Sequence, residues 1–131
     1  LNPVDADVTI HDSCVYARYE GVIDEPRLLL EAAGYSTRDP EFAGSQTFCC
    51  GGPIEALFPS RAVAIGGERV RPLRAAGDGP VATMCPICLA TLDKAAAGSL
   101  PMEDISALLA RACCPAGRPA DDGGRPVYSA R

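Results

Sequence analysis

The stretch GPVATMCPICLATLDKAAAG, residues 79–98, contains the local signals that decide the fold. Its first part, 79–85, opens with a Gly-Pro turn and continues into a short β-rich run, which predicts a strand. Its second part, 86–98, begins with proline and ends with glycine, which favour the start and the end of a helix. Two cysteines, Cys85 and Cys88, lie at the junction and are one helical turn apart. A strand that runs directly into a helix is the repeating unit of α/β proteins.

The same alternation runs through the rest of the chain. Short β-rich runs predict two further strands, at 7–12 and 45–50. Helix start and stop signals predict helices at 25–34, 53–76 and 101–112, the last of them preceded by a brief strand. Because strands alternate with helices, we expect an α/β fold with a mostly parallel sheet flanked by helices.

The helical segment 53–76 contains residues that interrupt helices. Pro59, the adjacent Gly66 and Gly67, and Pro72 all fall inside it. Proline removes a backbone donor and glycine adds backbone freedom, so we expect a break or a kink within this segment.

Length and composition indicate one domain followed by a tail. The chain has 131 residues, of which 47% are hydrophobic, and this suits a single core. Residues 115–131 are rich in proline and glycine and have little to bury. We therefore expect a folded domain at 1–114 and a flexible tail at 115–131.

Charge and hydropathy exclude two classes of partner. The net charge is −5 and no basic stripe is present, so binding to nucleic acid is disfavoured. No apolar run approaches the ~20 residues of a membrane helix, and no signal peptide is visible. The expected location is the cytoplasm, with contact to the inner face of a membrane only through partner proteins.

Seven cysteines are many for a chain in which no export signal is visible, and an odd number does not close into a disulfide framework. Cys14, the adjacent Cys49 and Cys50 (the cysteine pair), and Cys85 each follow a predicted strand, and Cys88 lies one turn beyond. Between Cys14 and the pair lie 34 residues, and 34 more lie between the pair and Cys85. In a parallel sheet the carboxyl ends of the strands meet at one edge, so we expect these five residues, the cysteine group, to form a metal site there.

The number of thiols limits the kinds of metal centre that this site could bind. Thiolates favour zinc, copper(I) or iron–sulfur clusters, and either a structural zinc ion or a cubane cluster takes four of them. A fifth ligand indicates a larger or asymmetric cluster, or a thiol left free for chemistry. Gly51 and Gly52 allow bare backbone to offer amide N–H groups to sulfur. Helix starts after Cys50 and Cys85 are expected to favour the thiolate form.

Two other hypotheses compete with a cluster. One is a zinc-stabilised interaction module with no redox role. The other is a metal-free dithiol enzyme, because a strand, C-P-x-C and a helix resemble a thioredoxin-like site at Cys85 and Cys88. This second hypothesis leaves Cys14 and the cysteine pair unexplained.

Other polar residues have simpler interpretations. His11, the only histidine, either serves the site by bonding a sulfur or relaying a proton, or is structural. Asp12 and Glu55 are interpreted as caps without a catalytic role. The arginines within 69–74 are expected on a solvated helix face, with docking to a partner subunit as the alternative. The last two cysteines, Cys113 and Cys114, are interpreted as packing or incidental thiols.

Four quoted stretches carry a family resemblance: HDSC, EPRLLL, CCGGPIEALFP and ATMCPICLATL. Together they resemble the cysteine-rich CCG domain, whose pattern is C…CC…CxxC with gaps in the mid-thirties. The resemblance runs from about residue 7 to residue 112. CCG domains occur in the cysteine-rich subunit of heterodisulfide reductase and in related iron–sulfur oxidoreductase subunits. The wording of CCGGP and TMCPIC is most similar to the heterodisulfide reductase branch.

The resemblance implies a cofactor, partners and an activity. The cofactor would be an iron–sulfur cluster, a noncubane 4Fe–4S centre in heterodisulfide reductase, held here by Cys14, Cys49, Cys50, Cys85 and Cys88. Some CCG domains hold zinc instead. The implied role is an electron-transfer subunit of a heterodisulfide-reductase-like oxidoreductase that acts on a thiol or disulfide or passes electrons to a carrier. Implied partners are a flavoprotein, a ferredoxin-like iron–sulfur chain, and a second CCG domain or a second copy, because family members usually carry two such domains.

Overall fold

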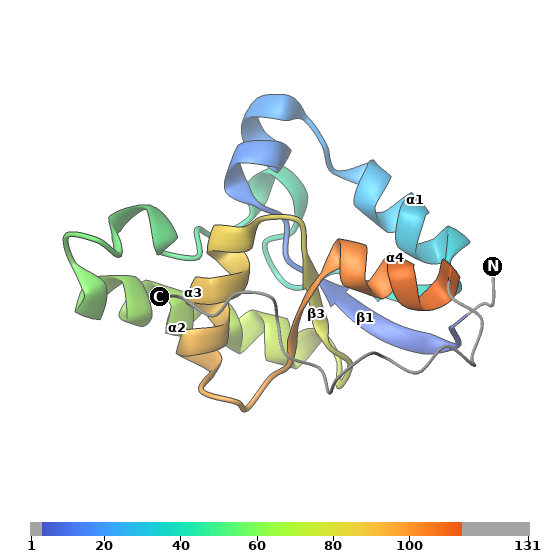
Figure 1. The fold of residues 1–131 in the computed structure, drawn as a ribbon. Coiled ribbons are helices and arrows are strands. Elements are labelled where there is room, and N and C mark those ends of the chain that lie inside the picture. The colour runs from blue at the N-terminus through green and yellow to red at the C-terminus, as the bar shows by residue number, and fades with distance from the viewer. Residues whose placement is uncertain (1–3, 114–131) are drawn as a thin grey trace.

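Four parallel strands form the centre of the molecule. The computed structural model describes residues 4–113 (Figure 1). The strands are β1 (Ala6–Ile10), β2 (Tyr35–Arg38), β3 (Val81–Thr83) and β4 (Met102–Asp104), and they lie in the order β2-β1-β3-β4. Every pair of neighbours is parallel. The predicted α/β fold with a parallel sheet is therefore confirmed.

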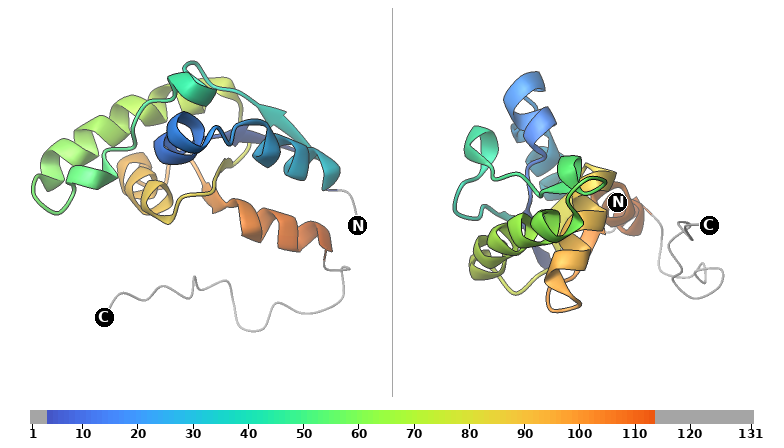
Figure 2. Two further views of the ribbon diagram at one scale, coloured as in Figure 1. Left: turned by 90° about the horizontal axis from the view of Figure 1, so that it is seen from above. Right: turned by 90° about the vertical axis from the view of Figure 1, so that its left-hand side faces the viewer.

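Two helices cover each face of this sheet. Helices α1 (Asp24–Ala32) and α4 (Ile105–Cys113) lie together on one face, and α2 (Pro59–Ala76) and α3 (Pro86–Ala96) lie alongside each other on the other (Figures 1 and 2). The first core joins the sheet to α1 and α4 through Val8, Ile10, Leu30 and Leu108, among others. The second core lies between the sheet, α2 and α3, and includes Leu73, Val81, Leu92, Cys50 and Cys88.

Strand β1 lies between β2 and β3, and the chain changes faces at this point. The connection from β1 to β2 passes through α1 on one face, and the connection from β2 to β3 passes through α2 on the other. Such a switch point leaves space beyond the carboxyl ends of the strands, where α/β proteins bind their ligands. Cys14 follows β1 and Cys85 follows β3, so both cysteines lie at this edge.

The predicted strand at 45–50 is wrong. The second strand of the sheet is instead β2, which Gly34 introduces at φ +91° after the end of α1. Residues Gly44–Gln46 form a 3₁₀ turn, and the chain to residue 50 is irregular. The reason is that side chains satisfy this backbone: Arg18 donates to the carbonyl oxygens of Ser45 and Thr47.

The predicted break within 53–76 is present and lies before Pro59. A 3₁₀ turn covers Gly52–Ile54, and Phe58 is non-helical before α2 begins at Pro59. Proline suits the first helical position because the N–H that it lacks has no partner there. Helix α2 then continues through the two glycines and Pro72 to Ala76.

The remaining predicted elements are present with shifted ends. The helices expected at 25–34, 86–98 and 101–112 are α1, α3 and α4, and the brief strand before the last helix is β4. A five-residue π-turn at Tyr16–Glu20 was not predicted. No helix within residues 4–113 has both the length and the apolar character that crossing a membrane requires. The tail expected at 115–131 and Cys114 lie outside the described residues.

Candidate metal centre

The five residues of the cysteine group come from three segments. Cys14 follows β1, the cysteine pair lies in the loop before α2, and Cys85 and Cys88 lie at the start of α3. The thiols influence one another's pKa values along a row of neighbours. Cys14 and Cys50 act on Cys49, Cys88 and Cys49 act on Cys50, and Cys50 and Cys85 act on Cys88. The group is therefore continuous in space. Across residues 4–113, no three Cys, His, Asp or Glu side chains already surround a point where one metal ion would fit.

Cys50 and Cys88 form the buried centre of this group, each about 2% exposed. The hydrogen bond with Cys88 lowers the pKa of Cys50 to about 6, although burial acts in the opposite direction. The same hydrogen bond and burial raise the pKa of Cys88. Within this hydrogen-bonded pair, the Cys50 thiol therefore loses its proton more readily than the Cys88 thiol. Thiols must lose such protons to bind metal.

The two glycines after the cysteine pair donate to sulfur, as predicted. The amide N–H of Gly51 lies 3.4 Å from Sγ of Cys49, and that of Gly52 lies 3.4 Å from Sγ of Cys50. At Cys49, burial raises the thiol pKa and the Gly51 amide opposes that shift. The helix expected after Cys50 is only the 3₁₀ turn, whereas Cys85 does directly precede α3. At Cys50 the thiolate form is therefore favoured by a hydrogen bond from a backbone amide rather than by the start of a helix.

Glycine is also required here by space. Gly51 has φ +88°, and a Cβ atom on it would lie 3.1 Å from Cα of Ala62 in α2. A Cβ atom on Gly52 would lie 3.0 Å from Oγ1 of Thr91 in α3. The turn after the cysteine pair is thus pressed between α2 and α3, and this holds Cys50 against Cys88.

Asp12 connects the end of β1 to the loop that carries the cysteine pair. Its carbonyl oxygen accepts a hydrogen bond from the Thr47 hydroxyl at 2.8 Å, and its carboxylate accepts one from the amide of Gly44 at 2.6 Å. Arg27 of α1 donates to both carboxylate oxygens of Asp12 at 2.9 Å. The prediction that Asp12 is a helix cap is wrong, because it is the buried anion of an ion pair.

Glu55 also has a partner other than a helix end. Its carboxylate pairs with Lys94 of α3, and this contact holds the pKa of Glu55 below its usual value. The Thr91 hydroxyl lies 3.5 Å from the same carboxylate. Glu55 therefore connects the turn after the cysteine pair to α3, rather than capping a helix through its side chain.

Arg69 is the residue that sequence reasoning missed. It was expected on a solvated helix face, and that expectation is correct for Arg71 and Arg74, but the Arg69 side chain is fully buried. Its Nε atom donates to Nδ1 of His11 at 3.1 Å. The helical spacing of the buried positions 62, 66, 69 and 73 could have found it.

His11 is buried together with Arg69, and its exposed fraction is 2%. Burial and the charge of Arg69 lower the pKa of His11 to about 3, so the imidazole is neutral at physiological pH. Burial also lowers the pKa of Arg69, to about 10, which leaves the guanidinium charged at physiological pH. The pair therefore carries one positive charge into the core beside the cysteine group.

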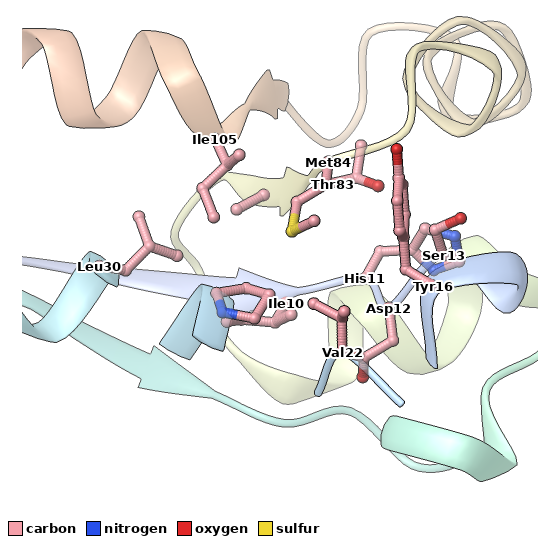
Figure 3. Close-up of a pocket in the computed structure, with 12 residues that line it drawn as sticks. Ile10, His11, Asp12, Ser13, Tyr16, Val22, Leu30, Thr83, Met84 and Ile105 are labelled. Atoms are coloured by element: carbon pink, nitrogen blue, oxygen red, sulfur yellow. The ribbon is translucent and has the colours of Figure 1, made fainter. Parts of the chain in front are cut away.

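A hollow opens at the carboxyl ends of β1 and β3 (Figure 3). Leu30 and Ile105 lie toward one end of it, and Ser13 and Tyr16 toward the other. None of the five cysteines lines the hollow, although it adjoins Cys14 and Cys85 in sequence through Ser13 and Met84.

Cys113 is separate from the cysteine group. It lies at the end of α4 and is exposed. The interpretation that it packs in the core is therefore wrong, and the interpretation that it is an incidental thiol remains. Its neighbour Cys114 lies outside the described residues. Within the described chain, the five cysteines of the predicted site are thus the ones that the fold brings together.

Comparison with known proteins points to one family. The model of the CCG cysteine-rich domain matches residues 8–93. A subunit of dihydromethanophenazine:CoB–CoM heterodisulfide reductase from Methanosarcina barkeri is 32% identical over 117 residues, which cover 84% of this chain and 28% of that protein. A subunit of fumarate reductase (CoM/CoB) from Methanothermobacter marburgensis is 31% identical over 116 residues, which cover 83% of this chain and 23% of that protein.

A bacterial relative extends the comparison. A probable iron–sulfur-binding oxidoreductase of Bacillus subtilis is 30% identical over 94 residues, which cover 70% of this chain and 13% of that protein. The chain thus matches between 13% and 28% of the length of these three relatives. The similarity concerns one domain within much longer proteins.

Proposed function

We propose, from the premise that the chain belongs to the CCG family of cysteine-rich domains, that it binds an iron–sulfur cluster and transfers electrons within an oxidoreductase. The observation that carries this proposal is the continuous group of five thiols contributed by three separate segments. Five thiols exceed the four of a structural zinc site or a cubane cluster. They suit a larger, asymmetric cluster, and the family resemblance supports a noncubane 4Fe–4S centre.

The residues present fit such a group. Cys14, the cysteine pair, Cys85 and Cys88 would hold it, and soft thiolate ligands are those that iron–sulfur clusters use. The amides of Gly51 and Gly52 already point to two of the sulfur atoms. When bound, the cluster would supply one-electron transfer. The protein would keep these thiols deprotonated, hold the cluster at the sheet edge and surround it with donors.

The relatives support a role in a larger assembly. Two of them are named as subunits of heterodisulfide reductase and fumarate reductase, and each is several times longer than this chain. We propose that this domain is a redox unit of an enzyme that acts on a thiol or disulfide, or passes electrons to a carrier. Its partners would be a flavoprotein or a ferredoxin-like chain and a second CCG domain, either in another protein or in a second copy. The proposed location is the cytoplasm.

Metal analysis of anaerobically purified protein tests this function. About four iron and four acid-labile sulfide per chain are expected, with an electron paramagnetic resonance (EPR) signal after oxidation. About one zinc without sulfide would contradict the proposal and make the domain a structural module. Protein without any metal, but with activity that depends on Cys85 and not on Cys14, would instead identify a dithiol enzyme.

A further inference from the structure

Arg69 is a buried cation without an anion bonded to it. Its Nη1 atom donates to the carbonyl oxygens of Glu41 and Phe42 at 2.9 and 3.1 Å, and its Nε atom donates to His11. No carboxylate among residues 4–113 lies within salt-bridge distance of it. Burying a charge is unfavourable unless a partner compensates it. The three neutral acceptors that Arg69 contacts leave its charge without a directly bonded counter-ion.

Two donors in this pair have no partner in the described part of the chain. They are Nη2 of Arg69 and Nε2 of His11, both fully buried. The guanidinium Nε atom can only donate, so Nδ1 of His11 must accept and its proton must reside on Nε2. Arg69 thus fixes the tautomer of His11. Within residues 4–113 the pair thus has three N–H bonds without a partner, two on Nη2 and one on Nε2, and one positive charge.

Arg69 and His11 lie next to the cysteine group. The helix that carries Arg69, α2, contacts the cysteine pair directly, because a Cβ atom on Gly66 of this helix would lie 3.2 Å from the carbonyl oxygen of Cys50. The charges of the Asp12 carboxylate and of a Cys88 thiolate both act on the guanidinium of Arg69, and His11 precedes Cys14 by three residues. An anionic group held by these thiols would therefore lie near a cation that no bonded anion neutralises.

We propose that Arg69, which orients the ring of His11, is the buried counter-charge of the cysteine group and sets the reduction potential of its cluster. This inference rests on the proposed function. A cluster held by five thiolates is strongly anionic, and each added electron makes it more so. In the protein interior a fixed positive charge stabilises the reduced state more than the oxidised state. Arg69 acts through this field, and it is a positioning residue rather than a ligand.

Charge variants of one helix test the inference. Arg69→Gln removes the charge but keeps N–H donors for the carbonyl oxygens, and Arg69→Lys keeps the charge. Arg71→Gln is the matched control, since Arg71 lies two residues away on the exposed side of α2. The cluster potential would be measured by redox titration followed by EPR.

We expect Arg69→Gln to lower the reduction equilibrium constant by about tenfold, which is about 59 mV for one electron. Arg69→Lys should lower it less, and Arg71→Gln should leave it unchanged because solvent screens the exposed charge. Equal potentials in wild type and Arg69→Gln, with equal iron content, would overturn the inference.

Cluster loading separates the remaining outcomes. If Arg69→Gln takes up no cluster while Arg69→Lys does, the requirement for the charge is supported by loading alone. If neither takes up a cluster while Arg71→Gln does, Arg69 is structural and the inference is overturned. A wild-type protein that takes up no iron and sulfide contradicts the proposed function itself, which keeps the two failures distinct.

Nitrogen NMR of the imidazole gives a readout that needs no activity. His11 is the only histidine, so labelling histidine with ¹⁵N yields one set of ring signals. We expect the proton on Nε2 and an unprotonated Nδ1. A proton on Nδ1 would show that Arg69 does not orient the ring, and would overturn that part of the inference.

Discussion

The hydroxyl of Thr47 donates a hydrogen bond to the carbonyl oxygen of Asp12 at 2.8 Å, and both residues are buried. Thr47 lies two residues before the cysteine pair, and Asp12 lies two residues before Cys14. One hydrogen bond therefore joins two of the three segments that carry the cysteine group.

Replacing Thr47 by valine should loosen this connection. The change keeps the shape of the side chain but removes the hydroxyl, so the carbonyl oxygen of Asp12 loses this hydrogen bond. We expect a loss of about 1–2 kcal/mol in the free energy of unfolding, measured with urea. Thr37→Val is the control, because the hydroxyl of Thr37 bonds the exposed Glu31 carboxylate, and its effect should stay within about 0.5 kcal/mol. Equal effects for the two variants would contradict the prediction.

Asp12→Asn should destabilise the protein more strongly. It removes the negative charge that two nitrogen atoms of Arg27 contact at 2.9 Å. This ion pair is buried, because the side chain of Asp12 is 1% exposed and that of Arg27 is 13% exposed. Removing the buried partner of such an ion pair costs about 3 kcal/mol. Arg27 keeps a second, exposed partner, Asp39, at 2.6 Å. Asp7→Asn, in an ion pair with exposed Arg38, should cost less than about 1 kcal/mol. Both values come from denaturant unfolding, and a small effect at Asp12 would show that Asp39 alone compensates Arg27.

The adjacent glycines of α2 should respond oppositely to alanine. A Cβ atom on Gly66 would lie 2.8 Å from Cβ of Ala95 and 3.2 Å from the carbonyl oxygen of Cys50, whereas one on Gly67 would contact nothing. Gly66→Ala should therefore destabilise the protein by about 1–3 kcal/mol. Gly67→Ala should stabilise it by up to about 1 kcal/mol, because alanine favours a helix. Thermal unfolding measures both, and a change of the same sign would refute the packing of α2 against α3.

Serine substitutions should divide the cysteines into two classes. Each change within the cysteine group should lower the iron and sulfide content of anaerobically purified protein, because serine is a poor ligand for iron–sulfur clusters. Cys113→Ser should leave both unchanged, because Cys113 is exposed at the end of α4 and separate from the group. Full loading of Cys14→Ser would remove Cys14 from the proposed ligand set.

The interpretation of the second strand shows where sequence reasoning failed. Residues 45–50 have a β-rich composition, but Arg18 donates to the backbone of this loop and the Thr47 hydroxyl donates to the carbonyl oxygen of Asp12. Just before the loop, the Asp12 carboxylate accepts from the amide of Gly44, and Arg69 donates to the carbonyl oxygens of residues 41 and 42. Those partners are far away in sequence. No local pattern could show that hydrogen bonds from three distant segments replace a strand ladder.

The amino-acid sequence by itself determined the alternation of strands and helices, and the cysteines that the fold brings together. Proline, glycine and β-branched runs bias the backbone locally, and the parallel strands β1 and β3 bring Cys14 and Cys85 to one edge. The cysteine pair follows no strand, and the loop before it is held by hydrogen bonds to Asp12 and Arg18. Only the tertiary structure decided what surrounds the thiols. Arg69 is charged and lies in a helix with exposed arginines, so its hydropathy predicts exposure. It is buried because α2 turns that position toward His11, and burial is a property of the whole packed fold.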